Sequence, residues 1–223
     1  MKIVILAAGE GVRMRPLTLT TPKPLLVYKD KTVLDHLFDS LPDEIEEAII
    51  SVKYLAEKIK DHCGNSFHGR KVSYVEGERN GNAMGFLQAK KYFVPGERFA
   101  VSYADEIITR EEINDCLKEQ YSWLCYRVSN PKEVGIALVD KDNYITDILE
   151  KPQNSPSNFA ANGFMVTDSN IFKYKPNVHK NGEYYFSDLM RQFATDHKVR
   201  AIEGDINHCQ LTSEEDLNRL NSK

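Results

Sequence analysis

The sequence predicts an α/β sandwich, and three observations support this prediction. Strand and helix patterns alternate through the first half of the chain, the second half is rich in strand patterns, and 223 residues suffice for one domain. The apolar run over residues 2–8, which Gly9 ends, has the composition of a fully buried parallel strand. We therefore expect a mostly parallel sheet in the first half, which the second half completes and covers at one end.

The first half is expected to contain four strands separated by helices. The strands are expected at Lys2–Ala8, Glu47–Val52, Lys71–Val75 and Arg98–Tyr103. The helices are expected at Thr32–Leu41, Tyr54–Cys63, Asn82–Tyr92 and Glu111–Gln120. The apolar residues of the first helix recur at helical spacing, and Gly64 is placed to end the second.

The second half is expected to be mainly strands. They are expected at Ser122–Val128, Gly135–Val139, Ile145–Leu149, Gly163–Thr167, Arg200–Glu203 and Asn207–Leu211, with a hairpin turn at Asp142-Asn143. Ser187 has the residue type of an N-cap for a helix that begins at Asp188. Residues 213–216 have the pattern of a capping box that opens a last helix.

Ligands of open α/β sheets bind beyond the carboxyl ends of the strands. The loops after Ala8 and after Tyr103 are therefore expected to face one cleft, together with the segments near Glu150 and Asn162. Polar and glycine-rich residues gather in these loops, so the cleft is the expected binding site.

Composition and charge exclude several classes of protein. The formal net charge is −4 and the pI is about 5.9, which disfavours a nucleic-acid partner. The four cysteines form no CxxC pair, so we expect free thiols and no zinc site. The longest apolar run is far shorter than the about 20 residues that a membrane span needs, and no leader peptide is recognisable. We therefore expect a cytoplasmic protein.

The loop after the first strand carries the clearest chemical signal. Gly9 and Gly11 allow the backbone to approach a ligand and to point N–H groups at it. Arg13 follows, and Lys23 stands between two prolines that restrict its position. Met14 breaks the GxGxxG dinucleotide pattern and no P-loop string occurs, so a different type of polyphosphate site is predicted.

The string Leu-Ala-Ala-Gly-x-Gly-x-Arg-x-x-Pro-Leu-Thr over residues 6–18, followed by Pro-Lys-Pro-Leu, resembles the signature of sugar-1-phosphate nucleotidylyltransferases. The resemblance covers nearly the whole chain. It implies a three-layer α/β/α sandwich with a mixed, mostly parallel, Rossmann-like sheet. It also implies a single nucleotidyltransferase domain over 1–223, with a nucleotide-binding half (1–120), a sugar-binding half (121–223) and no C-terminal β-helix domain. Such an enzyme joins an NTP and a sugar 1-phosphate and releases pyrophosphate, with Mg²⁺ as cofactor.

The resemblance implies a role for each residue of the nucleotide half that matches the motifs. The cradle of the triphosphate would comprise Leu6, Ala7, Ala8, Gly9, Glu10 and Gly11. Arg13 would stabilise the leaving pyrophosphate and Lys23 the transferring phosphoryl group. Asp105, at a strand end, would hold Mg²⁺ through its carboxylate.

Glu76 and Gly81 resemble the base-recognition segment of the family. A carboxylate only accepts hydrogen bonds, which suits the adjacent N1 and N2 donors of guanine. This favours GTP with mannose 1-phosphate, and the alternative is UTP or dTTP with glucose 1-phosphate.

The later motifs resemble the sugar site. The backbone of Gly135 would meet the sugar, Glu150 would accept from its hydroxyls, Lys151 would bind its phosphate and Asn162 would close on it. The Glu-Lys-Pro string at 150–152 argues against a small cytidylyltransferase that acts on a phosphorylated alcohol.

Gln210 departs from the family pattern, because the family has a second metal-binding Asp at this position. The metal would then be held by Asp105 and substrate phosphates, or Glu203 or Asp205 would replace the missing ligand, or turnover would be impaired. A non-catalytic, regulatory nucleotide-sugar-binding homologue therefore stays open as an alternative. The expected partners are an NTP and a sugar 1-phosphate, with no nucleic acid and no membrane; the oligomeric state stays open, a homodimer included.

Overall fold

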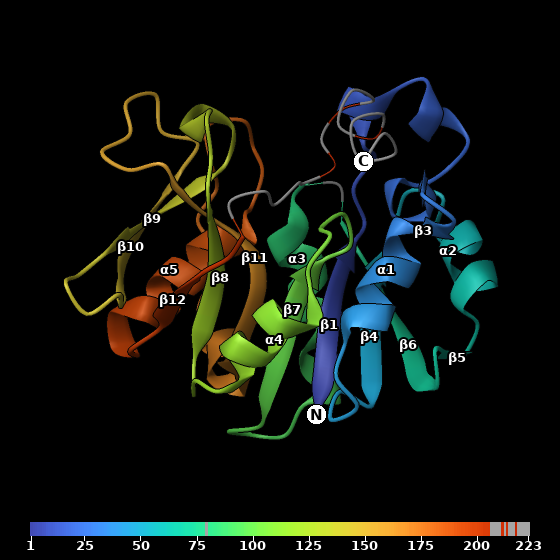
Figure 1. The fold of residues 1–223 in the computed structure, drawn as a ribbon, viewed down its shortest axis with the longest axis horizontal. Coiled ribbons are helices and arrows are strands. Elements are labelled where there is room, and N and C mark those ends of the chain that lie inside the picture. The colour runs from blue at the N-terminus through green and yellow to red at the C-terminus, as the bar shows by residue number, and fades with distance from the viewer. Residues whose placement is uncertain (79, 206–210, 212, 214–216, 218–223) are drawn as a thin grey trace.

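The computed structural model describes residues 1–78, 80–205, 211, 213 and 217. Within these residues a mixed ten-stranded sheet forms the centre of the molecule (Figure 1). Its strands are β1 (Lys2–Ala7), β4 (Glu47–Val52), β5 (Ser66–Phe67), β6 (Arg70–Glu76), β7 (Arg98–Tyr103), β8 (Ser122–Arg127), β9 (Gly135–Val139), β10 (Ile145–Glu150), β11 (Phe159–Asp168) and β12 (Arg200–Glu203). The helices are α1 (Val33–Ser40), α2 (Ala56–Cys63), α3 (Asn82–Leu87), α4 (Arg110–Leu117) and α5 (Phe186–Asp196). The short strands β2 (Val27–Tyr28) and β3 (Lys31–Thr32) form a separate hairpin.

The strand order is β10-β9-β11-β7-β1-β4-β6-β5, and β8 pairs with β11 and β12. The four central strands β7, β1, β4 and β6 are mutually parallel, whereas β11 pairs antiparallel with β7, β8 and β9. The first half of the chain therefore supplies the parallel centre and the second half extends it with antiparallel strands. The carboxyl ends of the central strands meet at one edge of the sheet, at the top of Figure 1.

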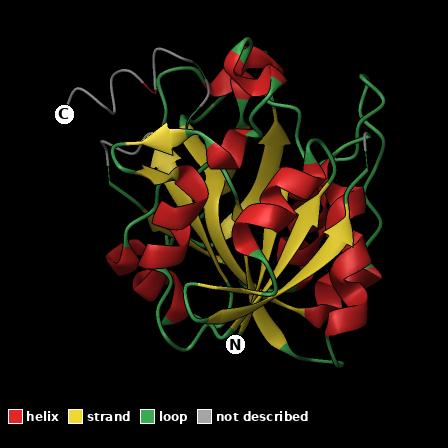
Figure 2. Cartoon of the chain, turned by 90° about the vertical axis from the view of Figure 1, so that its right-hand side faces the viewer, coloured by secondary structure: helices red, strands yellow, loops and turns green. Residues whose placement is uncertain are grey.

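Two apolar cores lie on opposite faces of this sheet, which makes the fold a three-layer sandwich (Figure 2). Ile3, Ile5 and Ala7 of β1 belong to the core that α1, α2 and α4 cover. Val4 and Leu6 belong to the core that α3 and α5 cover. Successive side chains of a strand point to opposite faces, so a strand buried on both faces must be apolar throughout. This explains the unbroken apolar run of β1.

The structure corrects several expected boundaries. The predicted N-cap Ser187 is wrong: α5 begins at Phe186, with Tyr185 as N-cap, because the Ser187 hydroxyl donates to Glu150 Oε2 at 2.5 Å. The strand expected at Gly163–Thr167 is twice as long: β11 starts at Phe159, directly after Ser157 and Asn158, and is buried along its whole length.

Two expected helices are shorter than the apolar pattern indicated. The first turn expected from Tyr54 is absent, because Leu55 adopts a left-handed conformation with φ 49° and α2 starts after it. The helix expected at Asn82–Tyr92 divides into α3 and a 3-10 helix over Gln88–Tyr92. The remaining elements agree within a few residues, including the turn at Asp142-Asn143.

The strand expected at 207–211 and the helix expected from 213 fall mostly on residues outside the described part of the chain. No helix among the described residues is long and apolar enough to cross a membrane. The three described cysteines, Cys63, Cys116 and Cys125, are buried free thiols, as expected.

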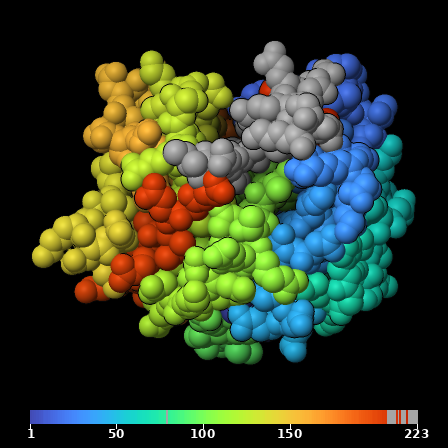
Figure 3. Space-filling model, viewed as in Figure 1, coloured from blue at the N-terminus to red at the C-terminus, as the bar shows by residue number. Residues whose placement is uncertain are grey.

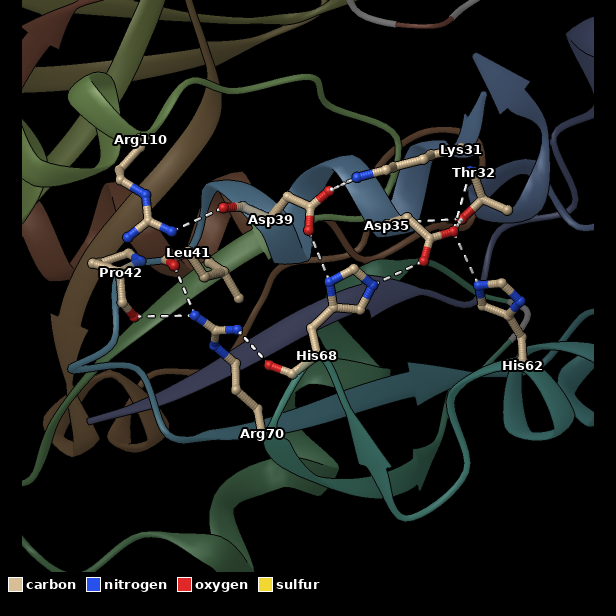
Figure 4. A network of polar contacts seen from close by, with 10 residues as sticks. All are labelled: Lys31, Thr32, Asp35, Asp39, Leu41, Pro42, His62, His68, Arg70 and Arg110. Atoms are coloured by element: carbon tan, nitrogen blue, oxygen red, sulfur yellow. Dashed lines mark hydrogen bonds and ion pairs between the residues drawn. The ribbon is translucent and has the colours of Figure 1, made fainter. Parts of the chain in front are cut away.

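A polar network ties α1 to the hairpin of β5 and β6 (Figure 4). The two ring nitrogens of His68 lie 2.9 Å from carboxylate oxygens of Asp35 and Asp39. Asp35 also completes a capping box with Thr32 at the start of α1 and lies 3.2 Å from His62. Burial favours the neutral form of Asp35, but hydrogen bonds from Thr32 and His68 outweigh it and lower the pKa of Asp35 to about 2.

We expect this network to weaken in acid. A carboxyl group whose pKa is lowered by folding stabilises the protein above its unfolded pKa, and this contribution disappears as the pH falls through the folded value. Urea unfolding of the wild type should therefore show a loss of about 2 kcal/mol between pH 5 and pH 2 that Asp35→Asn lacks. Asp43→Asn, at a fully exposed carboxylate, serves as control. An equal pH dependence of the wild type and Asp35→Asn would contradict the assignment.

Candidate nucleotide and sugar-phosphate site

A cavity of about 800 Å³ opens at the carboxyl ends of β1, β4 and β7. Figure 3 shows the face of the molecule on which the second half of the chain, coloured yellow-green to red, lies beside the first half, coloured blue to green. Ten of the predicted site residues line the cavity: Leu6, Ala7, Ala8, Gly9, Glu10, Gly11, Arg13, Lys23, Gly81 and Asp105. The structure thus brings the glycine-rich loop, the proline-flanked lysine and the strand-end aspartate into one space.

The loop after β1 is shaped by Gly11, which adopts φ 61°. The Gly11 carbonyl accepts from Met14 N and from Thr18 Oγ1, both at 2.9 Å. A Cβ atom at Gly11 would lie 3.0 Å from Thr18 Cγ2. Only glycine combines this left-handed conformation with so little space, so the glycine of the motif is required by the turn itself.

Lys23 and Asp105 both line the cavity and form an ion pair, although 82 residues separate them. Lys23 begins a 3-10 turn directly after Pro22, and Asp105 follows the end of β7. Their side chains are 13% and 23% exposed, so water screens the pair only partly. The two residues predicted to handle the transferring phosphoryl group and the metal therefore lie in direct contact.

The side chains that line the cavity can hold a magnesium ion only together with oxygen atoms of a bound substrate. Among the described residues no group of three His, Cys, Asp or Glu side chains converges on a metal position. Mg²⁺ is commonly held by one or two carboxylates and by substrate phosphates, which a single carboxylate at the cavity wall can satisfy. The suggested substitutes Glu203 and Asp205 do not line the cavity; Glu203 pairs with Arg127 at 2.9 Å. Gln210 lies outside the described residues.

Arg13 lines the cavity and pairs with a carboxylate from the second half of the chain. Its Nη1 lies 3.3 Å from Glu133 Oε2, in the turn that precedes β9, and both side chains are more than half exposed. The pair links the loop after β1 with the second half of the chain. A polyphosphate that binds Arg13 must compete with the Glu133 carboxylate.

The predicted sugar residues form a second cluster beside the cavity. Gly135 pairs with Glu150 in the β9–β10 register, and Glu150 Oε2 accepts from Ser187. Lys151 Nζ lies 3.1 Å from the Tyr185 hydroxyl and 4.4 Å from the centre of that ring. Gly135, Glu150 and Lys151 do not themselves line the cavity, but Tyr185 does. Tyr185 thus connects the two clusters.

Two other predicted residues, Asn162 and Glu76, do not line the cavity, and Gly81, which does, is held there by close packing. Gly81 adopts φ 112° and packs so closely that a Cβ atom would lie 2.2 Å from the Tyr184 carbonyl oxygen. Asn162 lies in the buried strand β11 and not in the cavity wall. The Glu76 side chain is 78% exposed and pairs with Lys53 at 2.6 Å, and Lys53 rather than Glu76 lines the cavity.

The motifs did not identify several residues of the cavity wall, namely Ser51, Lys53, Tyr54, Glu78, Tyr103, Glu183 and Tyr185. Ser51 to Tyr54 end β4 or follow it directly, so the rule of carboxyl strand ends could have found them. Glu183 and Tyr185 precede α5, and the pattern of their segment indicates only a helix start. Only the packing of α5 against the sheet brings them to the site.

Tyr103 stands between the two clusters. Burial, and then the negative charges of Glu150, Glu106 and Asp105, raise the pKa of its hydroxyl. A neutral hydroxyl at this position can donate to an oxygen of a bound substrate.

Comparison with known proteins identifies the family of this chain. A family model described as nucleotidyl transferase matches residues 2–208, which is most of the chain. The chain belongs to the nucleotidyl transferase family. It is 33% identical over 205 residues to the bifunctional protein GlmU of Methanocaldococcus jannaschii, an alignment that covers 91% of this chain and 49% of the relative. It is 29% identical over 206 residues to the UTP–glucose-1-phosphate uridylyltransferase AglF of Haloferax volcanii, covering 85% and 82%.

The chain spans about half the length of the GlmU relatives that it matches. Solved structures confirm the nucleotidyl transferase fold. A Bacillus anthracis protein described as a glucose-1-phosphate thymidylyltransferase aligns over 100% of this chain and 94% of its own, with a TM-score of 0.85 at 24% identity. A UDP-glucose pyrophosphorylase aligns over 99% of this chain and 97% of its own, with a TM-score of 0.85 at 21% identity. The predicted mixed α/β/α sandwich is therefore correct.

Proposed function

We propose that this protein is a sugar-1-phosphate nucleotidylyltransferase, with the nucleotide bound by residues 1–120 and the sugar phosphate by residues 121–223 of one domain. The observation that carries the proposal is the contact between Lys23 and Asp105 within a cavity that the glycine loop also lines. Tyr185 lines this cavity and contacts Lys151. The cation proposed for the sugar phosphate, Lys151, therefore lies beside the cavity that contains the cations proposed for the nucleotide.

A pyrimidine nucleotide with a glucose-type sugar 1-phosphate is the better supported substrate pair. The preference for GTP and mannose 1-phosphate depended on Glu76 alone, whose side chain pairs with Lys53 outside the cavity wall. The names of the relatives include a UTP–glucose-1-phosphate uridylyltransferase and a glucose-1-phosphate thymidylyltransferase. These names favour the alternative of UTP or dTTP with glucose 1-phosphate.

The proposed reaction is an in-line displacement at phosphorus. A phosphate oxygen of the sugar 1-phosphate forms a bond to the α-phosphorus, the bond from that phosphorus to the β-bridging oxygen breaks, and pyrophosphate leaves. No protein nucleophile is needed, so positioning and charge neutralisation provide the catalysis. Lys151 orients the attacking phosphate, Lys23 neutralises the transferring group and Arg13 the leaving pyrophosphate. Mg²⁺ on Asp105 would add positive charge at the phosphates.

Pyrophosphate release tests the proposal with GTP, UTP, dTTP, CTP and ATP against glucose 1-phosphate, mannose 1-phosphate and N-acetylglucosamine 1-phosphate, in Mg²⁺. Turnover with UTP or dTTP and one of the sugar phosphates is the expected result. Nucleotide binding without turnover of any pair would instead favour the non-catalytic regulatory homologue.

Arg13→Ala is expected to lower kcat about ten- to a hundredfold, because the charge that builds up on the leaving pyrophosphate loses one cationic partner. Arg15→Ala is the matched control, since Arg15 lies in the same loop and pairs with Glu10 at 3.1 Å but is not part of the cavity wall. Steady-state kinetics at saturating substrates measures both variants. An effect confined to KM would place Arg13 in binding alone.

A further inference from the structure

The loop after β1 carries two of the cations that the proposed mechanism uses, Arg13 and Lys23. Between β1 and β2 the chain forms three 3-10 helices of three residues each, and the middle one, Leu17–Leu19, lies between these two cations. Helices this short are weakly held by their own hydrogen bonds. The placement of both cations therefore depends on contacts between this loop and other parts of the chain.

Thr18 fixes the glycine turn from within the loop. It is fully buried, and its Oγ1 donates to Gly11 O at 2.9 Å. Its Cγ2 lies so near that a Cβ atom at Gly11 would come within 3.0 Å of it. Both branches of the Thr18 side chain therefore contact the turn or its immediate surroundings, and a displacement of Thr18 would displace Gly11.

Tyr54 holds Thr18 from outside the loop. Its hydroxyl donates to Thr18 O at 2.8 Å and, over a longer distance of 3.2 Å, to Leu19 O. Lys58 Nζ donates to the next carbonyl, Thr20 O, at 2.5 Å. The last carbonyls of a helix have no partner within it, so these donors from the β4–α2 region satisfy the end of the middle 3-10 helix. Apolar burial does not hold this end, because Leu19 is 54% exposed.

The turn that carries Tyr54 has a strained backbone. Leu55 adopts the left-handed conformation, with φ 49° and ψ 37°, which is unfavourable for a residue with a large side chain. Such a conformation persists only where the surrounding contacts impose it, and it is concentrated at functional segments. Tyr54 and Leu55 both line the cavity, and Lys58 lies in the first turn of α2. The strain is therefore located where the turn meets the loop after β1.

We propose that Tyr54 is a positioning residue for the loop after β1. Through Thr18 it fixes the turn at Gly11, and it anchors the segment that separates Arg13 from Lys23. This inference rests on the proposed function and deepens it. Tyr54 acts through the backbone of the loop and does not contact the reacting atoms. Without the anchor the two cations would occupy a wider range of positions, and a misplacement of about 1 Å in a catalytic group lowers the rate strongly.

The experiment compares kcat/KM of the full chain for the wild type, Tyr54→Phe, Thr18→Val and the double variant, with the nucleotide and sugar phosphate that turn over best. Tyr54→Phe removes the hydroxyl and keeps the ring in the cavity wall. It is expected to lower kcat/KM about three- to tenfold, the effect of one hydrogen bond. Because Tyr54 acts through Thr18, the double variant should lose little more than the more impaired single variant. Fully additive losses would show that Tyr54 acts independently of Thr18, as in direct contact with the nucleotide, and would overturn the proposal.

Tyr74→Phe is a closely matched control. The Tyr74 hydroxyl donates to Gly64 O at 2.7 Å, where Gly64 caps the end of α2, so this variant also removes one tyrosine hydroxyl from a carbonyl at a helix end. Neither residue belongs to the described wall of the cavity. The variant is expected to keep the kinetic constants of the wild type. Equal losses of kcat/KM in Tyr54→Phe and Tyr74→Phe would indicate a general effect of hydroxyl removal and would contradict the proposal.

Amide hydrogen exchange of the substrate-free protein tests the anchor without turnover. The amides of Met14 and Leu19 donate within the loop, to Gly11 O at 2.9 Å and to Pro16 O at 3.0 Å, so their exchange reports on its order. Tyr54→Phe is expected to speed exchange over residues 11–20 about threefold or more and to leave β1 and α4 unchanged, whereas Tyr74→Phe leaves the loop unchanged. If no nucleotide turns over, the proposed enzyme fails, and this measurement decides the inference separately. Loop exchange that Tyr54→Phe does not alter would overturn it.

Discussion

Lys23→Met is expected to lower kcat about a hundred- to a thousandfold, with a much smaller change in KM. The lysine is only 13% exposed and contacts Asp105 in the cavity wall, so no water or neighbouring side chain replaces its charge easily. A cation that stabilises charge developing in the transition state acts on kcat, and loss of one such preorganised group typically costs this much. Pyrophosphate release under saturating substrates measures the effect.

Asp105→Asn and the double variant extend the test. Because the two side chains touch, their effects on kcat should not add, and the double variant should lose less than the product of the single losses. Lys31→Met is the control, since Lys31 pairs with Asp39 at 2.7 Å on the surface, away from the cavity. A Lys23→Met enzyme that retains more than about a third of wild-type kcat would exclude Lys23 from the chemical step.

Gly81→Ala is expected to destabilise the protein by about 2–5 kcal/mol and to reduce kcat/KM sharply. The new Cβ atom would meet the Tyr184 backbone at 2.2 Å, and φ 112° is unfavourable for alanine. The clash lies between two hydrogen bonds, from Ala83 N to Tyr184 O at 3.1 Å and from Tyr184 N to Asn80 O at 2.7 Å. These bonds join α3 to the segment that carries Tyr185, so their loss would separate the two clusters of the site.

Gly69→Ala provides the matched control. Gly69 adopts φ 76°, but a Cβ atom there would meet nothing within 4 Å. Its cost should be limited to backbone strain, about 1 kcal/mol, with unchanged kinetics. Urea unfolding and pyrophosphate release, measured on both variants, separate steric from conformational effects. Similar losses in the two variants would show that the contact with Tyr184 does not matter.

Local patterns predicted most of the fold because they depend on short-range physics. The apolar run of β1 requires burial on both faces, which indicates a central parallel strand. Because the carboxyl ends of parallel strands lie at one edge of the sheet, Gly9, Gly11 and Asp105 were expected to lie near one another, and all three line the cavity. The helix boundaries were predicted less well: α2 starts only after the left-handed Leu55, and the hydrogen bond of Ser187 to Glu150 depends on a residue far along the chain.

The same distinction applies to the site. The glycine loop was recognisable from its residues, because the left-handed turn at Gly11 needs glycine whatever surrounds it. The partner of each charged residue was not recognisable. Arg13 pairs with Glu133 and Lys53 with Glu76, at separations of 120 and 23 residues. Periodicity and motif spacing contain no information about such pairs.

The sequence by itself determined the order and type of the central elements, the phosphate-type loop and the family that these motifs indicate. Only the tertiary structure decided that Lys23 touches Asp105, that Tyr185 joins the nucleotide cavity to Lys151, and that Lys53 rather than Glu76 forms the cavity wall. The physical reason is that secondary structure follows from burial and backbone geometry over a few residues. The charge environment of a site, by contrast, is set by side chains that meet only when the sheet and its helices are packed.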